Sequence, residues 1–451
     1  MMQTVELPIW LFSLILLFAV VTFASHFLFP SVRWFFRRRM ERVVKRVNER
    51  LERPIEPFKL ARRYDMIQRL IYDPEVSQAI ADHAKRNSVP ENVAFEQARK
   101  YSREIVPSFS ATAYFGIAIR IARGLSNALY LVRLGYHDDA GLSALDKDAT
   151  VVFVMNHRSN MDYVLVTYLA AERSALAYAV GEWARVWPLS RLIKAMGAYF
   201  IRRKSRGDLY RRVLARYVYL ATQAGVTQAM FPEGGLSLDG KIAPPKLGLL
   251  KYLTDGYEEG GRDVLFVPVA LNYDRVLEDR ILMAADAAGT RRFRARISVV
   301  AGFFFKQLWL RVIGRFHRFG YAAVSFGSPV SLRAHAQEYG NADAEHLGEE
   351  LMQRIADVVP VVPVPLLASV MKERESVVHA DLPGLMQAQL DRMKDAYVHM
   401  PRDNIEYASE IALKHLCERR ILRVEGDKVV VDDAQRFALR YYANTIEHLA
   451  K

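Results

Sequence analysis

The chain has 451 residues, of which 51% are hydrophobic and 25% are charged. This composition excludes an intrinsically disordered protein, and the length predicts two or three folded units. The net charge of +13 arises in two segments: residues 33–53 carry nine basic and three acidic side chains, and residues 291–318 carry eight basic and no acidic ones. The remainder is close to neutral. A single cysteine, Cys417, excludes both an intrachain disulfide and a metal site made of several cysteines.

Residues 1–32 are predicted to be a transmembrane anchor. After Glu6 the only ionisable side chain in this stretch is His26, and a helix of about 20 apolar residues spans the core of a bilayer. A cleaved signal peptide is the alternative, although the chain starts with no basic residue. Because the basic residues 33–53 follow directly, the body of the protein is expected to lie in the cytoplasm. These residues are expected to form a helix against anionic lipid, with a solvated linker helix as the alternative.

The rest of the chain divides by its periodicity. Residues 33–145 are expected to be a basic juxtamembrane and helical region, because apolar residues recur there at helical spacing. Helices are predicted at residues 64–72, 74–85, 90–106 and 113–134.

Residues 146–335 alternate short β-rich runs with helical stretches. This alternation predicts an α/β domain with a mixed sheet flanked by helices. Strands are predicted at residues 149–155, 198–201, 228–231, 264–271 and 321–326, and helices at 163–172 and 208–223. Residues 336–451 are expected to be a mostly helical C-terminal region, with a short β pair at 422–425 and 428–431.

A polar cluster, Asn-His-Arg-Ser-Asn-Met-Asp, follows the first predicted strand at residues 156–162. Side chains at the carboxyl ends of strands in an open α/β sheet point into the ligand crevice. His157 and Asp162 are five residues apart, which separates them by about 140° on a helix, so they meet only through a turn. A carboxylate on one imidazole nitrogen would leave the other nitrogen to act as a base. The alternative is a loop histidine satisfied by local hydrogen bonds.

Three more motifs begin or end at predicted strands. Gly-Ala-Tyr-Phe-Ile-Arg-Arg ends in Arg202 and Arg203, and guanidinium groups bind phosphate well. Phe-Pro-Glu-Gly-Gly, residues 231–235, is followed by Lys241 and Lys246, and its glycines let backbone N–H groups approach an anion. Val-Pro-Val-Ala-Leu-Asn-Tyr, residues 267–273, is the third. All four motifs can converge at one sheet edge.

This ordered set resembles the glycerol-phosphate acyltransferase family, and most strongly its large bacterial glycerol-3-phosphate 1-acyltransferases. The family's blocks look like His-Arg-Ser-x-Met-Asp, Gly-x-x-Phe-Ile-Arg-Arg, Phe-x-Glu-Gly-Gly and a Val/Ile-Pro-Val strand. Residues 102–110, 326–332 and 439–446 also look like family segments, so the resemblance covers roughly residues 65–451.

The resemblance implies the glycerolipid acyltransferase fold and a reaction at the bacterial inner (cytoplasmic) membrane. A fatty acyl group would pass from acyl-CoA or acyl-acyl carrier protein to the sn-1 hydroxyl of glycerol-3-phosphate in phospholipid synthesis, with no cofactor and no metal. His157 would be the base, Asp162 would hold its imidazole, and no acyl-enzyme is required; Ser159 as a nucleophile is the alternative. Substrate contacts are implied for Arg158, Arg202, Arg203, Glu233, Gly234, Gly235, Lys241 and Lys246.

Two departures from the family pattern bear on the acceptor. Leu236 and Leu238 stand where arginines usually follow Glu-Gly-Gly, and Asn160 stands where close relatives often have a second histidine. Dihydroxyacetone phosphate and lysophosphatidate therefore stay open as acceptors, and an inactive membrane-attached scaffold stays open as a function of another class. One of Arg202 and Arg203 could be a structural ion pair, and Glu233 a buried capping carboxylate.

Residues 291–318 combine basic and aromatic side chains, among them Trp309. This pattern is expected to contact an anionic lipid surface, on the same side of the protein as residues 33–53. The alternatives are an α/β core segment with a solvated basic rim, and stacking on nucleic-acid bases. A retained anchor favours lipid over nucleic acid as the partner.

Overall fold

The computed structural model describes residues 8–138, 141–142, 144–170, 174–181, 189–202, 207–289 and 318–450, with the backbone alone at 23–37, 40, 136–137 and 189. The chain divides into two compact units, Met1–Pro54 and Ile55–Lys451. The predicted segment 291–318 lies outside the described residues except for Arg318, so its expected contact with lipid is untested.

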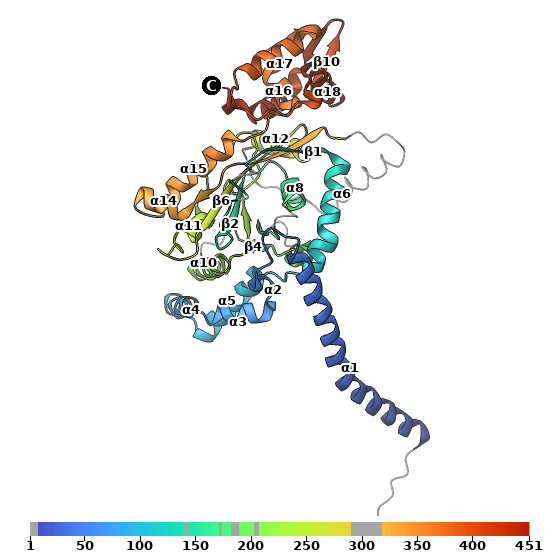
Figure 1. Ribbon diagram of the computed structural model, residues 1–451, viewed down its shortest axis with the longest axis vertical. Coiled ribbons are helices and arrows are strands. Elements are labelled where there is room, and N and C mark those ends of the chain that lie inside the picture. The colour runs from blue at the N-terminus through green and yellow to red at the C-terminus, as the bar shows by residue number, and fades with distance from the viewer. Residues whose placement is uncertain are drawn as a thin grey trace, which may run out of the picture. The chain divides into compact units, whose positions relative to one another are not determined.

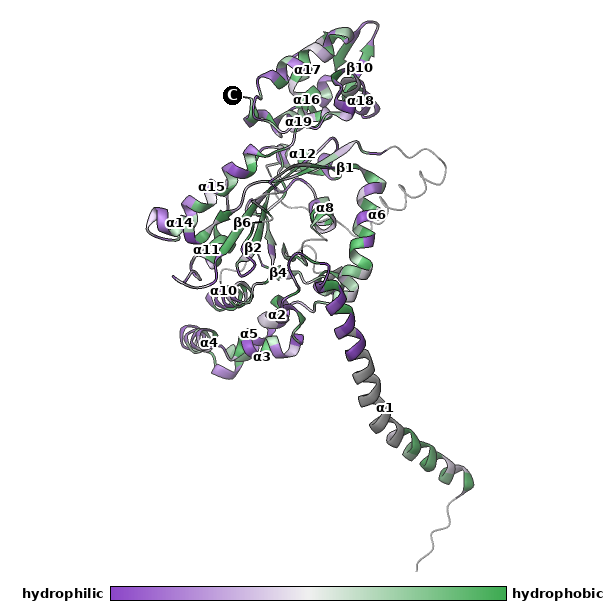
Figure 2. Ribbon diagram, viewed as in Figure 1, coloured by the Kyte–Doolittle hydropathy of each residue, from purple (hydrophilic) through white to green (hydrophobic). Residues whose placement is uncertain are grey.

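The first unit is a single long helix, α1 (Ile9–Asn48). Its N-terminal part is apolar and its C-terminal part hydrophilic, as Figure 2 shows by colour. The following large apolar side chains of this helix are exposed: Ile9, Trp10, Phe12, Leu14, Ile15, Leu16, Leu17, Phe18, Val20 and Val21. Among the described residues, no helix offers an apolar stretch long enough to cross a bilayer. The transmembrane helix predicted over residues 1–32 includes residues 1–7, which lie outside the described residues, and residues 23–32, which are described by their backbone alone.

A helical region opens the second unit. Local signals set its helices: α4 starts at Pro74, where the Asp73 side chain accepts a hydrogen bond from the N–H of Glu75 at 3.1 Å, and it ends at Ser88 in the left-handed conformation. The predicted helices 64–72, 74–85 and 90–106 are confirmed. The helices are α2 (Pro57–Leu60), α3 (Arg63–Ile71), α4 (Pro74–Asn87), α5 (Glu91–Ile105), the π-helical η1 (Thr112–Ala118) and α6 (Ile119–Leu129).

A mixed eight-stranded sheet follows, in the order β1-β7-β6-β2-β5-β3-β4, with β8 paired to β6. All pairs are parallel except those of β6 with β7 and with β8. The mixed sheet predicted from the sequence is confirmed. The strands are β1 (Leu131–His137), β2 (Thr150–Met155), β3 (Ala177–Gly181), β4 (Tyr199–Ile201), β5 (Gln228–Met230), β6 (Val264–Tyr273), β7 (Tyr321–Phe326) and β8 (Val330–Ser331).

The sequence prediction missed three of these strands, β1, β3 and the two-residue β8. The helix predicted over 113–134 stops at Leu129, and β1 then pairs in parallel with β7. β1 thus precedes the domain start expected at residue 146. β3, Ala-Tyr-Ala-Val-Gly, is a short run in which two alanines and a glycine weaken the β signal of Tyr and Val, and it pairs with β4 and β5.

Helices cover both faces of the sheet. In Figure 1, α11, α14 and α15 lie on one side of it, and α6 and α8 lie on the other. The helices of this part are α8 (Met161–Leu169), α9 (Leu189–Ala195), α10 (Asp208–Gln223), α11 (Gly248–Thr254), α12 (Asp279–Ala287), α14 (Leu332–Tyr339) and α15 (Ala344–Asp357).

The C-terminal region is mostly helical, as predicted, and packs around the buried helix α16 (Pro363–Met371). Its β pair is confirmed as β10 (Leu422–Glu425) and β11 (Lys428–Val431), and β9 (Ser376–Val378) adds a third strand. Its other helices are α17 (Leu382–Asp391), α18 (Ile405–Glu418), α19 (Arg436–Asn444) and the 3₁₀ turns η3 (His379–Asp381), η4 (Pro401–Asp403), η5 (Asp433–Gln435) and η6 (Glu447–Leu449).

A buried carboxylate ties this region to the sheet. Asp274, at the end of β6, accepts hydrogen bonds from the N–H of Tyr321 at 2.7 Å and from the N–H of Val364 at 2.8 Å. Burial raises the pKa of Asp274 to about 7. One side chain thus joins β6, β7 and the first turn of α16.

We therefore expect Asp274→Ala to lower the free energy of unfolding by about 2–4 kcal/mol, because two buried N–H groups lose their acceptor. Urea denaturation measures this. Asp286→Ala, an exposed aspartate on α12, is the matched control and should change stability by less than about 0.5 kcal/mol. Equal stability of the two variants would show that Asp274 is not the link.

Candidate active site

The polar cluster of residues 156–162 forms a turn between β2 and α8. Asn156 begins it and fixes its position: its amide donates to the carbonyl of Leu271 at 3.0 Å and accepts from the N–H of Leu271 at 2.8 Å. This pair of bonds joins the ends of β2 and β6, so the turn projects from the middle of the sheet.

His157 and Asp162 meet across this turn, as the sequence predicts. Nδ1 of His157 lies 2.9 Å from Oδ2 of Asp162. The same oxygen accepts from the N–H groups of Arg158 at 2.8 Å and Ser159 at 3.0 Å, and the other oxygen accepts from the hydroxyl of Tyr273 at 2.5 Å. Asp162 thus receives four hydrogen bonds, and Nε2 is the imidazole nitrogen left to move a proton.

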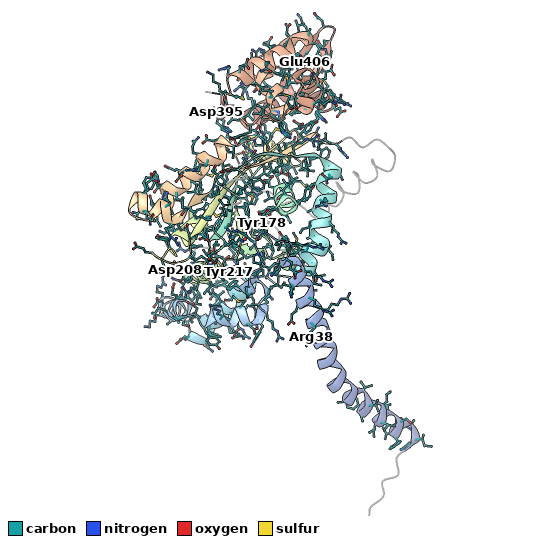
Figure 3. All side chains as sticks on the ribbon, in the orientation of Figure 1. Arg38, Tyr178, Asp208, Tyr217, Asp395 and Glu406 are labelled. Carbon is teal, nitrogen blue, oxygen red and sulfur yellow. The ribbon has the colours of Figure 1, made fainter. Side chains whose placement is uncertain are left out.

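Aromatic rings enclose the imidazole. The His157 ring stacks on Phe231 with 4.0 Å between centroids and meets the edge of Tyr163 at 5.5 Å. Tyr163 in turn contacts Tyr178, which lies in the interior of the unit in Figure 3. His157 is only 2% exposed. Hydrogen bonds and charges act more strongly in such an apolar setting than in water.

Glu233 is a structural carboxylate. It accepts from the N–H of His157 at 2.8 Å and from the N–H of Ala243 at 3.2 Å, and burial raises its pKa. Its two oxygens hold the backbones of the catalytic turn and of the following loop together. The alternative considered for Glu233, a buried capping carboxylate, is therefore what the structure shows.

Glycines let this loop, residues 231–246, pass close to other backbone. Gly234 and Gly240 have φ values of +66° and +85°. A Cβ at Gly240 would lie 2.0 Å from the carbonyl oxygen of Tyr441, and one at Gly234 would lie 2.6 Å from Cδ of Lys246. Gly235 is half-buried beside them. Gly240 is thus required for the contact between the loop and α19.

Arg158 is completely buried and points away from solvent. Its Nη1 donates to the carbonyls of Gly240 and, at 3.2 Å, of Lys241, whereas Nε and Nη2 have no hydrogen-bond partner among the described residues. Arg158 therefore supports the glycine-rich loop. This placement does not support the expected contact with a substrate.

Arg202 is engaged elsewhere. Its guanidinium binds Glu104 through two hydrogen bonds of 2.8 and 2.5 Å and stacks on Tyr101 and Tyr210. Glu104 raises the pKa of Arg202. Arg202 follows β4, which is three strands from β2 and so roughly 14 Å away. The ion-pair alternative is thus confirmed for Arg202, and Arg203 lies outside the described residues.

Lys241 and Lys246 are the exposed basic residues of the predicted set. Their loop returns to the catalytic turn, because the N–H of Ser237 donates to the carbonyl of His157 at 2.9 Å. Leu236 and Leu238 of the same loop are half-buried and pack against the core.

Sequence reasoning missed the roles of Tyr273 and Glu278. Tyr273 is the last residue of β6, the strand with the Val-Pro-Val motif. A tyrosine at the polar end of a buried strand is a sequence signal for a hydroxyl group near the site. Glu278 accepts from the hydroxyl of Ser159 at 2.7 Å and from the amide of Asn160 at 3.0 Å. No sequence pattern connects it to the turn, because it lies more than a hundred residues away.

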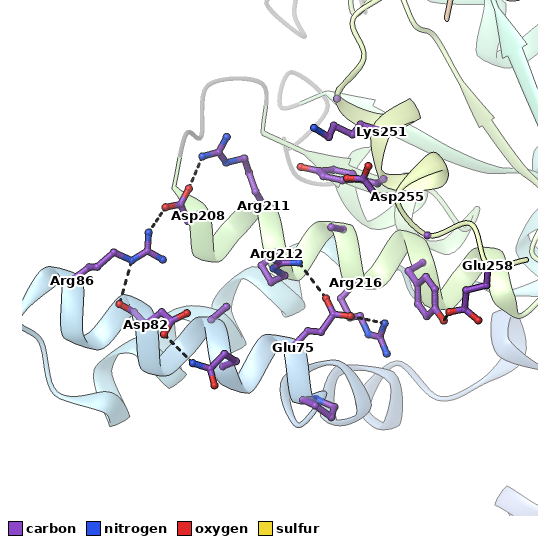
Figure 4. A pocket seen from close by; sticks show the side chains of 18 residues that line it. Glu75, Asp82, Arg86, Asp208, Arg211, Arg212, Arg216, Lys251, Asp255 and Glu258 are labelled. Atoms are coloured by element: carbon purple, nitrogen blue, oxygen red, sulfur yellow. Dashed lines mark hydrogen bonds and ion pairs between the residues drawn. The ribbon is translucent and has the colours of Figure 1, made fainter. Parts of the chain in front are cut away.

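A pocket of about 1100 Å3 lies between α4, α10 and α11 (Figure 4). Of the predicted site residues that the structure describes, none lines it. Its arginines face its acids: Arg86 and Arg211 bind Asp208, and Arg212 and Arg216 bind Glu75. These four arginines are thus engaged in ion pairs, and Lys251 also lines the pocket.

The Arg202–Glu104 pair yields a test. We expect Arg202→Ala to lower the free energy of unfolding by about 3 kcal/mol, because it takes the guanidinium from a buried carboxylate. The double variant Arg202→Ala/Glu104→Ala should recover part of that loss, as measured by urea denaturation. Wild-type stability in Arg202→Ala would contradict the structural role.

Comparison with known proteins supports an acyltransferase. Residues 138–272 match the family described as Acyltransferase, and residues 308–450 match the Glycerol-3-phosphate acyltransferase C-terminal region. The first match contains the turn of residues 156–162 and the glycine-rich loop. The second contains α16 to α19, and hydrogen bonds of Asn272 to Thr445 and of Val364 to Asp274 join this region to the end of β6.

Curated relatives carry the same name. Glycerol-3-phosphate acyltransferase of Pseudomonas fluorescens (strain SBW25) is 25% identical over 86% of this chain and 48% of its own length. That of Aeromonas hydrophila subsp. hydrophila is 28% identical over 87% of this chain and 50% of its own length. The chain thus spans about half the length of the curated relatives it matches.

Among solved structures, that of the 1-acyl-sn-glycerophosphate (LPA) acyltransferase PlsC from Thermotoga maritima is 19% identical, with a TM-score of 0.29, and covers 57% of this chain and 83% of that one. The chain therefore contains a segment that matches the Acyltransferase family and, after it, a segment that matches the Glycerol-3-phosphate acyltransferase C-terminal region, and the curated relatives it resembles are named glycerol-3-phosphate acyltransferase.

Proposed function

We propose that the protein transfers a fatty acyl group from an acyl thioester to the sn-1 hydroxyl of glycerol-3-phosphate. The observation that carries this proposal is the His157–Asp162 contact of 2.9 Å, held at the end of β2 by hydrogen bonds to both carboxylate oxygens. The names of the curated relatives agree with it. The donor is acyl-CoA or acyl-acyl carrier protein, and the reaction needs no further cofactor.

The chemistry follows from the imidazole. Nε2 of His157 takes the proton of the acceptor hydroxyl as its oxygen attacks the thioester carbonyl carbon. The carbon–sulfur bond then breaks, and the imidazolium returns the proton to the departing thiolate. Asp162 keeps Nδ1 protonated and stabilises the transient positive charge. The aromatic rings around His157 limit the access of water, which would otherwise hydrolyse the thioester.

The acceptor's phosphate needs positive charge near this imidazole. The proposal assigns phosphate binding to Lys241 and Lys246, which are exposed on the loop that contacts the His157 backbone, and keeps Arg203, which lies outside the described residues, as a further candidate. Lysines bind phosphate as point charges, without the bidentate geometry of arginine. Dihydroxyacetone phosphate and lysophosphatidate present the same phosphate and must be tested beside glycerol-3-phosphate.

We expect His157→Ala to reduce kcat by about 10²–10⁴-fold in a thioester-release assay run separately with the three acceptors, because it removes the base. Asp162→Asn should act in the same direction with little change in KM. His379→Ala, an exposed histidine of the C-terminal region, is the control. Full activity of His157→Ala would exclude this mechanism, and no turnover of the wild type with any acceptor would favour an inactive scaffold.

The proposal includes attachment to a membrane through α1, with the catalytic body on the cytoplasmic side of the bacterial inner membrane. The support is the row of exposed apolar side chains from Ile9 to Val21, followed along the same helix by basic residues such as Arg38 and Arg42. Apolar area binds the bilayer interior, and basic residues bind anionic headgroups.

A flotation assay of the full chain with vesicles of neutral or part-anionic lipid tests this attachment. Leu16→Glu/Phe18→Glu should move most of the protein from the floating to the free fraction, because two charges replace exposed apolar side chains. Leu16→Ile/Phe18→Leu is the matched control and should float as the wild type does. Equal flotation of the charged variant would exclude α1 as the attachment.

A further inference from the structure

Three carboxylates hold the turn of residues 156–162, those of Asp162, Glu233 and Glu278, and of these Asp162 is hydrogen-bonded to the imidazole. Asp162 is itself the last residue of the turn and accepts hydrogen bonds from the N–H groups of Arg158 and Ser159. Glu278 lies just before α12 and binds the same turn through Ser159 and Asn160. Its Oε2 accepts from the hydroxyl of Ser159 at 2.7 Å, and its Oε1 accepts from the N–H of Asn160 at 3.2 Å and from its side-chain amide at 3.0 Å.

We propose, on the basis of the acyl-transfer function above, that Glu278 is a positioning residue for His157 and that the C-terminal region fixes Glu278 through Tyr442. Glu278 touches neither the imidazole nor the proposed substrates. It acts on the residues between His157 and Asp162, whose path decides whether the imidazole and the carboxylate meet.

Asn160 supplies two of the three hydrogen bonds between the turn and Glu278. Its backbone and its side chain both donate to the same oxygen of Glu278. The departure from the family pattern at this position therefore has a structural use: an amide at 160 secures the turn to α12. Ser159 is the other tether, and it also accepts the N–H of Met161 at 3.1 Å, which joins Glu278 to the first turn of α8.

The C-terminal region holds the segment that carries Glu278. The hydroxyl of Tyr442 donates to Oδ2 of Asp279 at 2.6 Å and accepts from the N–H of Val276 at 3.2 Å. Arg419 binds both Asp279 and the Tyr442 hydroxyl. Val276 and Asp279 lie on either side of Glu278, so α18 and α19 determine where its carboxylate stands.

Helix α19 also holds the glycine-rich loop, because the side chain of Asn444 donates to the carbonyl of Asp239 at 2.8 Å. The Arg-Tyr-Tyr-Ala-Asn-Thr sequence of residues 440–445 thus serves the site from both sides. Truncation or loosening of α19 would release the turn and the loop together.

The charges around Glu278 determine what a change of its charge would do. The groups facing it are Asp162 on α8, Tyr130 before β1, Tyr273 on β6 and Tyr441 on α19. Burial raises the pKa of Glu278, and Asp162 raises it further. The three groups that donate to Glu278 act against this rise, because hydrogen bonds from Ser159 and Asn160 favour the ionised carboxylate.

Kinetics of three variants in the full chain test the proposal. Asn160→Ala and Glu278→Gln should each lower kcat by about tenfold or more while the KM for the acyl donor stays within about twofold, because they disturb orientation and not binding. Tyr442→Phe should act in the same direction. Asp286→Asn, an exposed aspartate on the same helix α12, is the matched control and should behave as the wild type.

Glu278→Gln has a second signature, which a mere loss of stability lacks. If Glu278 positions the imidazole, NMR of histidine-labelled protein at one pH should show His157 signals that differ between Glu278→Gln and the wild type, because the His157 ring stacks on Phe231 and its signals depend on its orientation to that ring. The His157 signal is assigned by its loss in His157→Ala, and the signal of the exposed His379 should not move.

The outcomes separate the two proposals. Variants with wild-type kcat and unmoved His157 signals would overturn the role of Glu278. A wild-type protein that turns over no acceptor would overturn the acyl-transfer function, and the NMR comparison would still decide on Glu278. Loss of all activity in Ser159→Ala together with an acyl-enzyme on the wild type would make Ser159 a nucleophile with Glu278 as its base, and would overturn the positioning role.

Discussion

The site depends on one buried carboxylate, that of Asp162. An isolated charge of this kind is unfavourable in an apolar interior, and Asp162 is accommodated because the imidazole, two backbone N–H groups and the hydroxyl of Tyr273 all donate to it. Each donor comes from a different part of the turn or from β6. The carboxylate therefore organises the turn and orients His157 at the same time. Its loss would disturb both the path of the turn and the orientation of the imidazole.

The sheet supplies the partners of this carboxylate. β2 carries His157, its neighbour β6 carries Tyr273, and its other neighbour β5 leads into Phe231 and Glu233. Parallel strands bring their carboxyl ends to one edge, so three segments far apart in the sequence meet there. The C-terminal region then covers the continuation of β6 and the glycine-rich loop. Its role in the site is to hold these backbones in place rather than to supply reacting groups.

The sequence sufficed for those features that local patterns determine. The strand–turn–helix around His157, the helix over residues 208–223 and the β10–β11 pair followed from periodicity and turn residues. Arg202 could not be interpreted in that way, because its partner Glu104 lies about a hundred residues earlier and only the fold brings the two together. The same holds for Glu278 and the turn. β3 was missed for a related reason, since its pairing and not its composition makes it a strand.

Arg158 and Arg202 were both expected to contact the substrate. In the structure Arg158 binds the glycine-rich loop and Arg202 binds Glu104, so neither guanidinium is placed to bind a phosphate. A bidentate guanidinium would select a phosphate by its geometry, whereas Lys241 and Lys246 attract it mainly by charge. Leu236 and Leu238, which replace arginines in the same loop, pack inward and add no polar contact. In the proposed reaction, the shape of this loop is therefore a second determinant of the acceptor. Gly240, Arg158 and α19 set that shape, so the C-terminal region takes part in the proposed selection.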